Sequence, residues 1–134
     1  MTCNTYGLGT LEHYKFVVIF SEFQGKLLLS RHRARTTWET QGGHIESGET
    51  PLEAAKRELY EESGAADFDI TPLCDYWAGD QQSGANGMVF TAVIKALKPL
   101  PESEMAEIRQ FDTLPDNITY PAITPVLYRV WKHQ

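Results

Sequence analysis

Apolar and polar residues follow one another along the chain in patterns that predict several β-strands. The apolar, β-branched run YKFVVIF at residues 14–20 is followed by KLLLS at 26–30, and SEFQG between them supplies a turn, so we expect a hairpin. DFDITPLCDYWAG at 67–79 and MVFTAVIKAL at 88–97 predict two longer strands, separated by the Gly/Gln/Asn-rich loop DQQSGANG. EIRQF at 107–111 predicts one more strand.

The best-defined element is a helix at about residues 51–63. Thr50 is a favourable N-cap, Pro51 suits the first helical position, and Glu53 stands where it completes a capping box. Gly64 follows, as a left-handed C-cap residue should. The buried stripe of this helix is expected to consist of Leu52, Ala55 and Leu59.

A second helix is expected to begin between Pro121 and Pro125. Its apolar positions recur at helical spacing, at Val126, Leu127, Val130 and Trp131. The segment RHRARTTWETQGG is expected to be a loop, with a short strand at 38–40.

Composition and charge restrict the possible functions. A chain of 134 residues with 42% apolar residues fits one globular domain, spanning residues 1–134. The net charge of −6 argues against a nucleic-acid polymer as partner, because a phosphate backbone calls for a basic face. It allows a small phosphate-bearing molecule when a cation mediates the contact. Because no signal peptide and no apolar run of membrane-spanning length occurs, we expect a cytoplasmic protein without a membrane partner.

The stretch RELYEESG places three carboxylates on one side of the first helix. Glu58, Glu61 and Glu62 are spaced i, i+3 and i+4, and like charges at this spacing each cost about 0.2 to 0.5 kcal/mol of helix stability. A solvated acidic surface is one explanation. The other is a site for a divalent cation such as Mg²⁺ or Mn²⁺, which prefers carboxylate, water and phosphate oxygens.

The segment GHIESGETPLEAAKRELYEESGA, residues 43–65, resembles the signature of the Nudix hydrolases at every defining position. That pattern is Gly, five residues, Glu, seven residues, Arg-Glu, an aliphatic residue, any residue, Glu-Glu, any residue, Gly and a small apolar residue. The positions are filled by Gly43, Glu49, Arg57, Glu58, Leu59, Glu61, Glu62, Gly64 and Ala65. The resemblance covers about residues 14–132. It implies an α+β fold, a Nudix-type α/β/α sandwich with a central mixed β-sheet, and the strand-rich pattern agrees with this fold. It also implies hydrolysis of a nucleoside diphosphate linked to another group.

The resemblance also implies roles for individual residues. Glu58 and Glu62 would be ligands of Mg²⁺, with Mn²⁺ as the alternative metal, and Glu61 a ligand or the general base. The carbonyl of Gly42 would be a backbone ligand. Glu107 matches a distal glutamate that serves as ligand or base in many members, and Glu102 and Glu104 are rivals for that role.

Other positions of the signature imply structural or substrate-binding roles. Arg57 is expected to pair with Glu49, and Gly43 and Gly64 to serve turns. In some relatives an arginine after the second strand contacts substrate phosphate; Arg31 is the candidate here, with a solvated basic loop as the alternative. Trp38 could stack on a base or belong to the core.

Within the family the chain looks most like the branch that hydrolyses 8-oxo-dGTP to the monophosphate and pyrophosphate. It departs from that branch at 40–41, where Thr-Gln replaces Phe-Pro and should loosen the loop that carries the Gly42 carbonyl. The branch's purine-reading asparagine has no clear match, since Ile123 or Thr124 stands there. ADP-ribose, dinucleoside polyphosphates and nucleotide sugars are alternative substrates, and a non-catalytic nucleotide-binding regulatory module is the alternative of another class. We expect a monomer or a homodimer.

Overall fold

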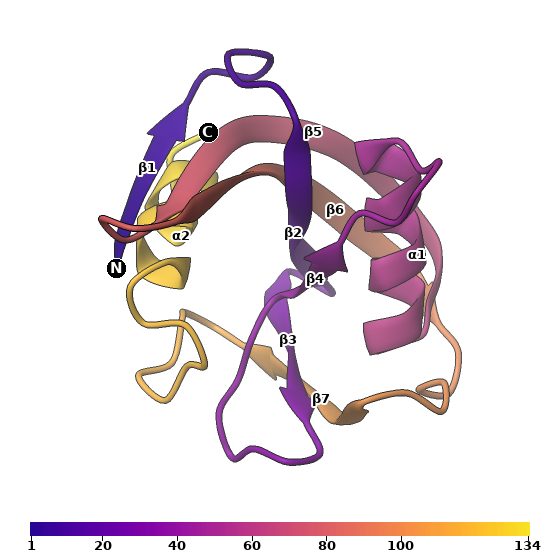
Figure 1. The fold of residues 1–134 in the computed structure, drawn as a ribbon. Helices are drawn as coiled ribbons and strands as arrows, with labels where there is room; N and C mark the ends of the chain where they lie inside the picture. Colours follow the sequence, from indigo (N-terminus) through magenta and orange to yellow (C-terminus); the bar gives the residue numbers. More distant parts are fainter.

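A mixed β-sheet lies between two helices in the computed structural model, which describes residues 1–134 (Figure 1). The elements in chain order are β1 (Thr2–Tyr6), β2 (Tyr14–Phe23), β3 (Lys26–His32), β4 (Gln41–His44), α1 (Pro51–Ser63), β5 (Ala65–Gly79), β6 (Gly84–Leu97), β7 (Met105–Phe111) and α2 (Thr124–Lys132). The predicted α+β sandwich with a central mixed sheet is confirmed. Neither helix is long and apolar enough to cross a lipid bilayer.

The seven-stranded sheet has the order β1-β5-β6-β2-β3-β7, and β4 pairs with β2 beside this path. Among the paired strands, only β2 and β6 run parallel. One edge of β2 therefore faces β6, and the other is shared, because its first half pairs with β4 and its last residues pair with β3. This shared edge brings β4 against α1, and the two elements lie next to each other in Figure 1.

Two cores lie on opposite faces of the sheet, because successive strand residues point to opposite sides. On β2, Val17 and Ile19 pack with Leu59 of α1. Phe20 points the other way and packs with Leu127 of α2. All of these side chains are at most 1% exposed. Apolar burial therefore holds each helix against its face of the sheet.

The β2–β3 hairpin is confirmed, but its turn is shorter than expected. Gln24 and Gly25 alone form it, with φ values of 55° and 80°. Two successive left-handed residues suit a two-residue hairpin turn whose twist matches that of the strands. Ser21–Phe23 therefore stays in the sheet, paired with β3 and β6, where the sequence suggested a turn.

Three other strand predictions need correction. The short strand expected at 38–40 is replaced by isolated bridges, Ser30 with Glu39 and Trp38 with Ile118, and the strand lies at β4 instead. The loop at 80–87 is also shorter, because β6 already begins at Gly84. There the ring of Trp77 covers the glycine so closely that an added Cβ would lie 2.2 Å from it. The edge strand β1 was not predicted, since its sequence TCNTY lacks an apolar alternation.

Helix α1 has the predicted bounds and caps, but not the predicted buried stripe. Thr50 and Glu53 form the capping box, and Gly64 is left-handed at φ 82°. Ala54, Ala55 and Leu59 are fully buried, whereas Leu52 is 39% exposed. The helix is therefore rotated about its axis so that the Ala54 side faces the sheet, and this rotation carries Glu58 and Glu62 inward.

Candidate active site

Glu62 is more deeply buried than Glu58 and Glu61, the other two glutamates of the helical triplet. Its Oε1 accepts a hydrogen bond from the backbone N–H of Gly42 at 2.8 Å, which ties the end of α1 to β4. Burial raises the pKa of Glu62 to about 9, and the Gly42 N–H only partly opposes this shift. Without a cation, the Glu62 carboxyl is therefore protonated at neutral pH.

Glu58 lies one turn earlier on the same side of α1. Its side chain is 13% exposed, and burial raises its pKa in spite of the neighbouring Arg57. The backbone of Gly43 passes directly over the carboxylate, because a Cβ on that residue would lie 2.7 Å from Glu58 Oε2. The doubled glycine of β4 thus permits a close approach between strand and carboxylates. At Gly42 an added Cβ would meet the carbonyl oxygen of Val17 at 2.3 Å.

Arg57 fixes the loop before the helix against the acidic side chains. The predicted pair with Glu49 is present and is two-pronged, with Nε 2.7 Å from Oε2 and Nη2 3.0 Å from Oε1. Arg57 also donates to Glu58 Oε1 at 2.5 Å and to the His44 carbonyl at 3.1 Å. The hydrogen bonds to Glu49 lower its pKa to about 2. Glu61, 48% exposed, has only a longer contact of 3.4 Å to the same guanidinium.

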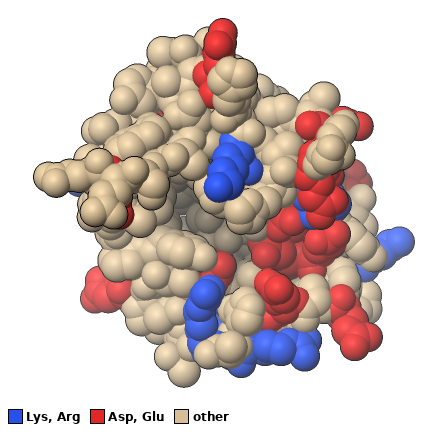
Figure 2. Space-filling model, viewed as in Figure 1, with Lys and Arg blue, Asp and Glu red and all other residues tan.

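These carboxylates line a hollow of about 420 Å³, which we call the acidic hollow. Its lining contains no hydrophobic residue and consists of Glu46, Arg57, Glu58, Glu61, Glu62, Glu102, Ser103 and Glu104. Figure 2 shows acidic side chains gathered on the α1 side of this face of the molecule. Side chains from α1, from the loop before it and from the segment before β7 therefore meet in one place.

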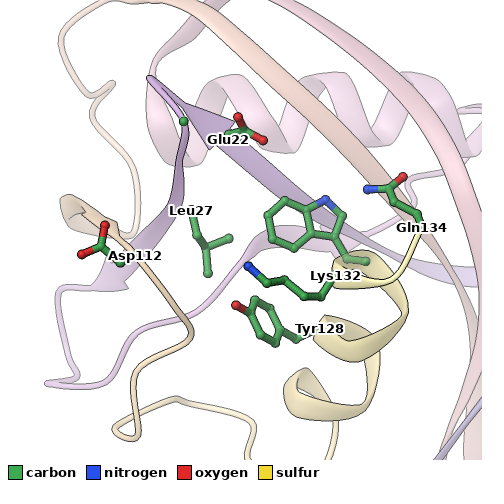
Figure 3. A pocket seen from close by; sticks show the side chains of 8 residues that line it. Glu22, Leu27, Asp112, Tyr128, Lys132 and Gln134 are labelled. Atoms are coloured by element: carbon green, nitrogen blue, oxygen red, sulfur yellow. The ribbon is translucent and has the colours of Figure 1, made fainter.

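A second hollow lies between the β2–β3 hairpin and the C-terminal end of α2 (Figure 3). Its volume is about 270 Å³, and Leu27, Tyr128 and Trp131 form its apolar part. Single charges from Glu22, Asp112 and Lys132 surround it, without a cluster of one sign. Because none of the α1 carboxylates reaches it, the acidic hollow is the candidate for catalysis.

Glu107 lies on β7 opposite Arg31 of β3 and does not line the acidic hollow. Its Oε1 is 3.1 Å from Arg31 Nε, and its Oε2 is 3.1 Å from Arg109 Nη2. The hydrogen bond from Arg31, followed by that from Arg109, lowers the pKa of Glu107. A ligand or base role for Glu107 stays a prediction that requires its release from both arginines. Its two rivals, Glu102 and Glu104, already line the acidic hollow.

The basic loop borders the acidic hollow at one point. Arg33 Nη2 donates to the carbonyl of Ser103, which lines the hollow, at 2.5 Å. Arg31 is 26% exposed and is held by Glu107 and by the Arg35 carbonyl, so its phosphate-binding role stays a prediction.

Trp38 lies in the core and is 4% exposed. The guanidinium of Arg109 lies 4.9 Å above its ring, and Phe111 packs against its edge. The indole has no open face on which a base could stack in this arrangement. Stacking by Trp38 therefore stays a prediction that depends on movement of Arg109.

The donor set of the acidic hollow fits a hard divalent cation, although no three side chains converge on one point as they stand. Glu58 is turned toward Arg57, and Glu62 toward Gly42. Mg²⁺ keeps several water molecules and needs only one or two carboxylates plus phosphate oxygens, so a preformed cage is not required. A cation would also favour the ionised form of Glu62, whose charge is otherwise disfavoured by burial.

We expect the metal-free protein to lose stability as the pH rises from about 5 to about 9. Between an ordinary value of 4.5 and about 9, the unfolded chain has released the Glu62 proton while the folded chain still holds it. The stabilising contribution of Glu62 is complete below 4.5 and is lost as the pH rises through about 9. Thermal unfolding in a chelator should show a fall of about 5 °C or more across this range. Glu62→Gln should flatten the profile; an unchanged slope in that variant would contradict the assignment to Glu62.

Two parts of the hollow were not predicted as site residues. Glu46 lines it from the loop before α1, and Ser103 from the segment before β7. The sequence offers only their neighbourhood as a signal: Glu46 lies within the signature segment, and Ser103 lies between Glu102 and Glu104. Loop residues reach a site through tertiary packing, which leaves no periodic pattern in the sequence.

Comparison with known proteins places this geometry in a family. The sequence pattern of the NUDIX domain matches residues 11–125. Among curated proteins, the RNA pyrophosphohydrolase of Francisella philomiragia is 36% identical over 53 residues, 40% of this chain and 34% of the relative. That of Halorhodospira halophila is 38% identical over 56 residues, 42% of this chain and 31% of the relative. The matched segment thus spans about a third of these relatives.

Solved structures share the fold over most of the chain. The pyrophosphohydrolase BsRppH of Bacillus subtilis superposes with a TM-score of 0.82 and 24% identity, over 98% of this chain and 90% of the other. A UDP-X diphosphatase superposes with a TM-score of 0.74 and 22% identity, over 94% of this chain and 67% of the other. The sequence match, supported by this fold, shows that the chain belongs to the NUDIX domain family.

Proposed function

We propose that this protein is a Mg²⁺-dependent pyrophosphohydrolase that cleaves a phosphoanhydride bond in the 5′ polyphosphate of a nucleotide. The observation that carries this proposal is the largely buried Glu62, tied to Gly42 at the edge of a hollow that is lined only by polar side chains. Burying a carboxyl without a cationic partner is costly, and a divalent cation bound there would remove that cost. Membership of the NUDIX family supports the same chemistry.

The residues of the acidic hollow would have different roles in hydrolysis. Bound Mg²⁺ would neutralise phosphate oxygens and stabilise the charge of the transition state. Glu58 and Glu62 would hold the cation, and Arg57 keeps Glu58 in place from its other side. The oxygen of a water molecule attacks phosphorus, the bond to the bridging oxygen breaks, and the leaving phosphate takes its electron pair. The proton of the water passes to a carboxylate. Glu61, Glu102 and Glu104 are exposed side chains that line the hollow, and they are the candidates for this base.

The substrate that we favour is the 5′ polyphosphate end of RNA. The curated relatives quoted above are RNA pyrophosphohydrolases, and the matched segment gives 36 to 38% identity. The net charge of −6 speaks against binding a long phosphate backbone. It does not oppose binding of a terminal polyphosphate, which only needs the hollow and the arginines of the adjoining loop. The cytoplasm is the location that goes with such a substrate.

The oxidised nucleotide 8-oxo-dGTP is the alternative that the sequence favoured. The structure offers little for reading its base at the start of α2. Ile123 makes no side-chain cap there, and Thr124 is 5% exposed. ADP-ribose, dinucleoside polyphosphates and nucleotide sugars remain alternative substrates for the same chemistry.

A turnover screen with Mg²⁺ tests the proposal. The panel contains a 5′-triphosphorylated RNA oligonucleotide, 8-oxo-dGTP, dGTP, ADP-ribose, diadenosine polyphosphates and nucleotide sugars, with phosphate and pyrophosphate release as the readout. We expect the RNA to have the highest kcat/KM and chelation to abolish turnover. A higher kcat/KM for 8-oxo-dGTP than for the RNA would contradict the proposed substrate. No turnover of any compound would leave the non-catalytic nucleotide-binding module as the better description.

A further inference from the structure

A chain of buried hydrogen bonds connects the interior of the sheet to the end of α1. Ser21, Ser30 and Gln41 lie on three different strands, and each is 0% exposed. The Ser21 hydroxyl lies 2.6 Å from Gln41 Oε1, and Gln41 Nε2 lies 3.0 Å from Ser30 Oγ. Ser30 Oγ lies 2.8 Å from the backbone carbonyl of Glu62.

Each side-chain polar atom in this chain has a hydrogen-bond partner, and the hydrogen bonds from Ser21 to Glu62 run in one direction. The Ser21 hydroxyl donates to the Gln41 carbonyl oxygen, the Gln41 amide donates to Ser30, and the Ser30 hydroxyl donates to Glu62. The second amide hydrogen of Gln41 goes to the carbonyl of Leu28 at 3.2 Å. A fully satisfied buried network favours one arrangement strongly, because any slip leaves a buried polar group unpaired.

The chain ends at a carbonyl that the helix itself leaves free. The last four carbonyls of an α-helix lack intrahelical partners. In α1, the N–H of Gly64 satisfies Tyr60, and Ser30 satisfies Glu62 from the neighbouring strand. Two separate contacts therefore hold Glu62, with Ser30 on its backbone and the Gly42 N–H on its side chain.

We propose that Gln41, acting with Ser30, is a positioning residue that sets where Glu62 and Gly42 lie relative to each other. Gln41 directly precedes Gly42, and through Ser30 it also reaches Glu62. The Gln41 side-chain amide thus influences both partners of the hydrogen bond between the Gly42 N–H and the Glu62 carboxyl. This inference rests on the proposed function for its catalytic meaning, but not for its geometry. The loosening expected from Thr-Gln in place of Phe-Pro does not follow, because Gln41 is pinned on all its polar atoms.

Gln41→Met and Ser30→Ala test the proposal, with Tyr14→Phe as control. Methionine keeps most of the volume of glutamine and removes the amide. The control deletes a part-buried hydrogen bond of 2.7 Å to Asp75, a residue that does not line the acidic hollow, so it lowers stability by a similar route. Three readouts are compared below the melting temperature of each variant: hydrogen exchange of the Gly42 amide without metal, Mn²⁺ affinity, and kcat and KM on triphosphorylated RNA.

We expect both test variants to lose protection of the Gly42 amide and to bind Mn²⁺ about 10-fold more weakly, while the control does neither. In turnover, kcat should fall by about 10-fold or more with a smaller change in KM. The proposal is overturned if both variants only melt earlier, as the control does, and keep Gly42 protection and Mn²⁺ affinity. If Gln41→Met does not fold, Ser30→Ala decides by the same readouts. Absent turnover in the wild type would count against the proposed function alone, since exchange and Mn²⁺ affinity still decide this inference.

Discussion

Replacing Glu62 by glutamine is expected to lower kcat by about 10²- to 10³-fold or more while the fold stays intact. The amide oxygen of the introduced side chain can still accept the hydrogen bond from Gly42, which is 2.8 Å long in the wild type. Only the ability to carry a negative charge toward a cation is lost. Glu58→Gln should act in the same direction, because its carboxylate is 13% exposed and adjoins the same hollow. Steady-state kinetics with saturating Mg²⁺ measure both effects.

The matched control is Glu53→Gln on the same helix. Glu53 closes the capping box by accepting from the Thr50 N–H at 2.9 Å, and glutamine can accept in the same way. Glu53 does not line the acidic hollow, so turnover should stay within about two-fold of the wild type. Melting temperatures show whether a variant loses turnover because its fold is destabilised or because it lacks the carboxylate. At pH 8 in a chelator, Glu62→Gln should melt higher than the wild type, because glutamine folds without the proton uptake that the Glu62 carboxyl requires at this pH. A collapse of the metal-free fold in this variant would make Glu62 a structural residue.

The sequence was sufficient where local chemistry determines the structure. Thr50, Glu53 and Gly64 fix the ends of α1 through capping that involves only neighbouring residues, and the predicted bounds are those observed. The spacing of the glutamates then places them on one side of the helix. The ion pair between Arg57 and Glu49 could be predicted because both residues are defining positions of the family signature. The loop before α1 brings the two side chains together.

Tertiary packing decided what local patterns could not. Three apolar positions did not set the rotation of α1, so Leu52 was assigned to the core although it is 39% exposed. Strand β4 contains two glycines and has little intrinsic tendency to be a strand, and it exists because β2 offers a free edge. The register of β7 against β3 places Glu107 beside Arg31, which spacing along the chain does not reveal.

The same limit applies to Gln41. In sequence it is a departure from a Phe-Pro pattern that should loosen a loop. In the structure its amide contacts Ser21 and Ser30 from two other strands, and these partners are visible only once the sheet is assembled. A buried amide that is hydrogen-bonded to neighbouring hydroxyls can restrict the backbone as much as a proline does. If the amide moved, it would lose these hydrogen bonds without gaining any to water.

Replacing Arg57 by methionine is expected to lower the stability of the metal-free protein by about 2 to 3 kcal/mol and the melting temperature by roughly 10 °C. Methionine keeps the apolar stem but leaves Glu49 and Glu58, 18% and 13% exposed, without their cationic partner. The His44 carbonyl also loses its donor at 3.1 Å. The value is set below that for a fully buried pair because the Arg57 side chain is 23% exposed. Thermal unfolding at pH 7 in a chelator measures it.

Arg129→Met is the control, since Arg129 is an exposed arginine on α2 for which no ion pair is found, and its loss should change stability by no more than about 0.5 kcal/mol. Arg57→Lys should recover only part of the loss, because an ammonium cannot grip both oxygens of Glu49 as the guanidinium does at 2.7 and 3.0 Å. Mg²⁺ should raise the melting temperature of Arg57→Met more than that of the wild type, because a cation beside Glu58 replaces the missing positive charge. If Mg²⁺ stabilises both proteins equally, Arg57 and the cation do not share Glu58, and the acidic hollow would have to bind its metal through other carboxylates.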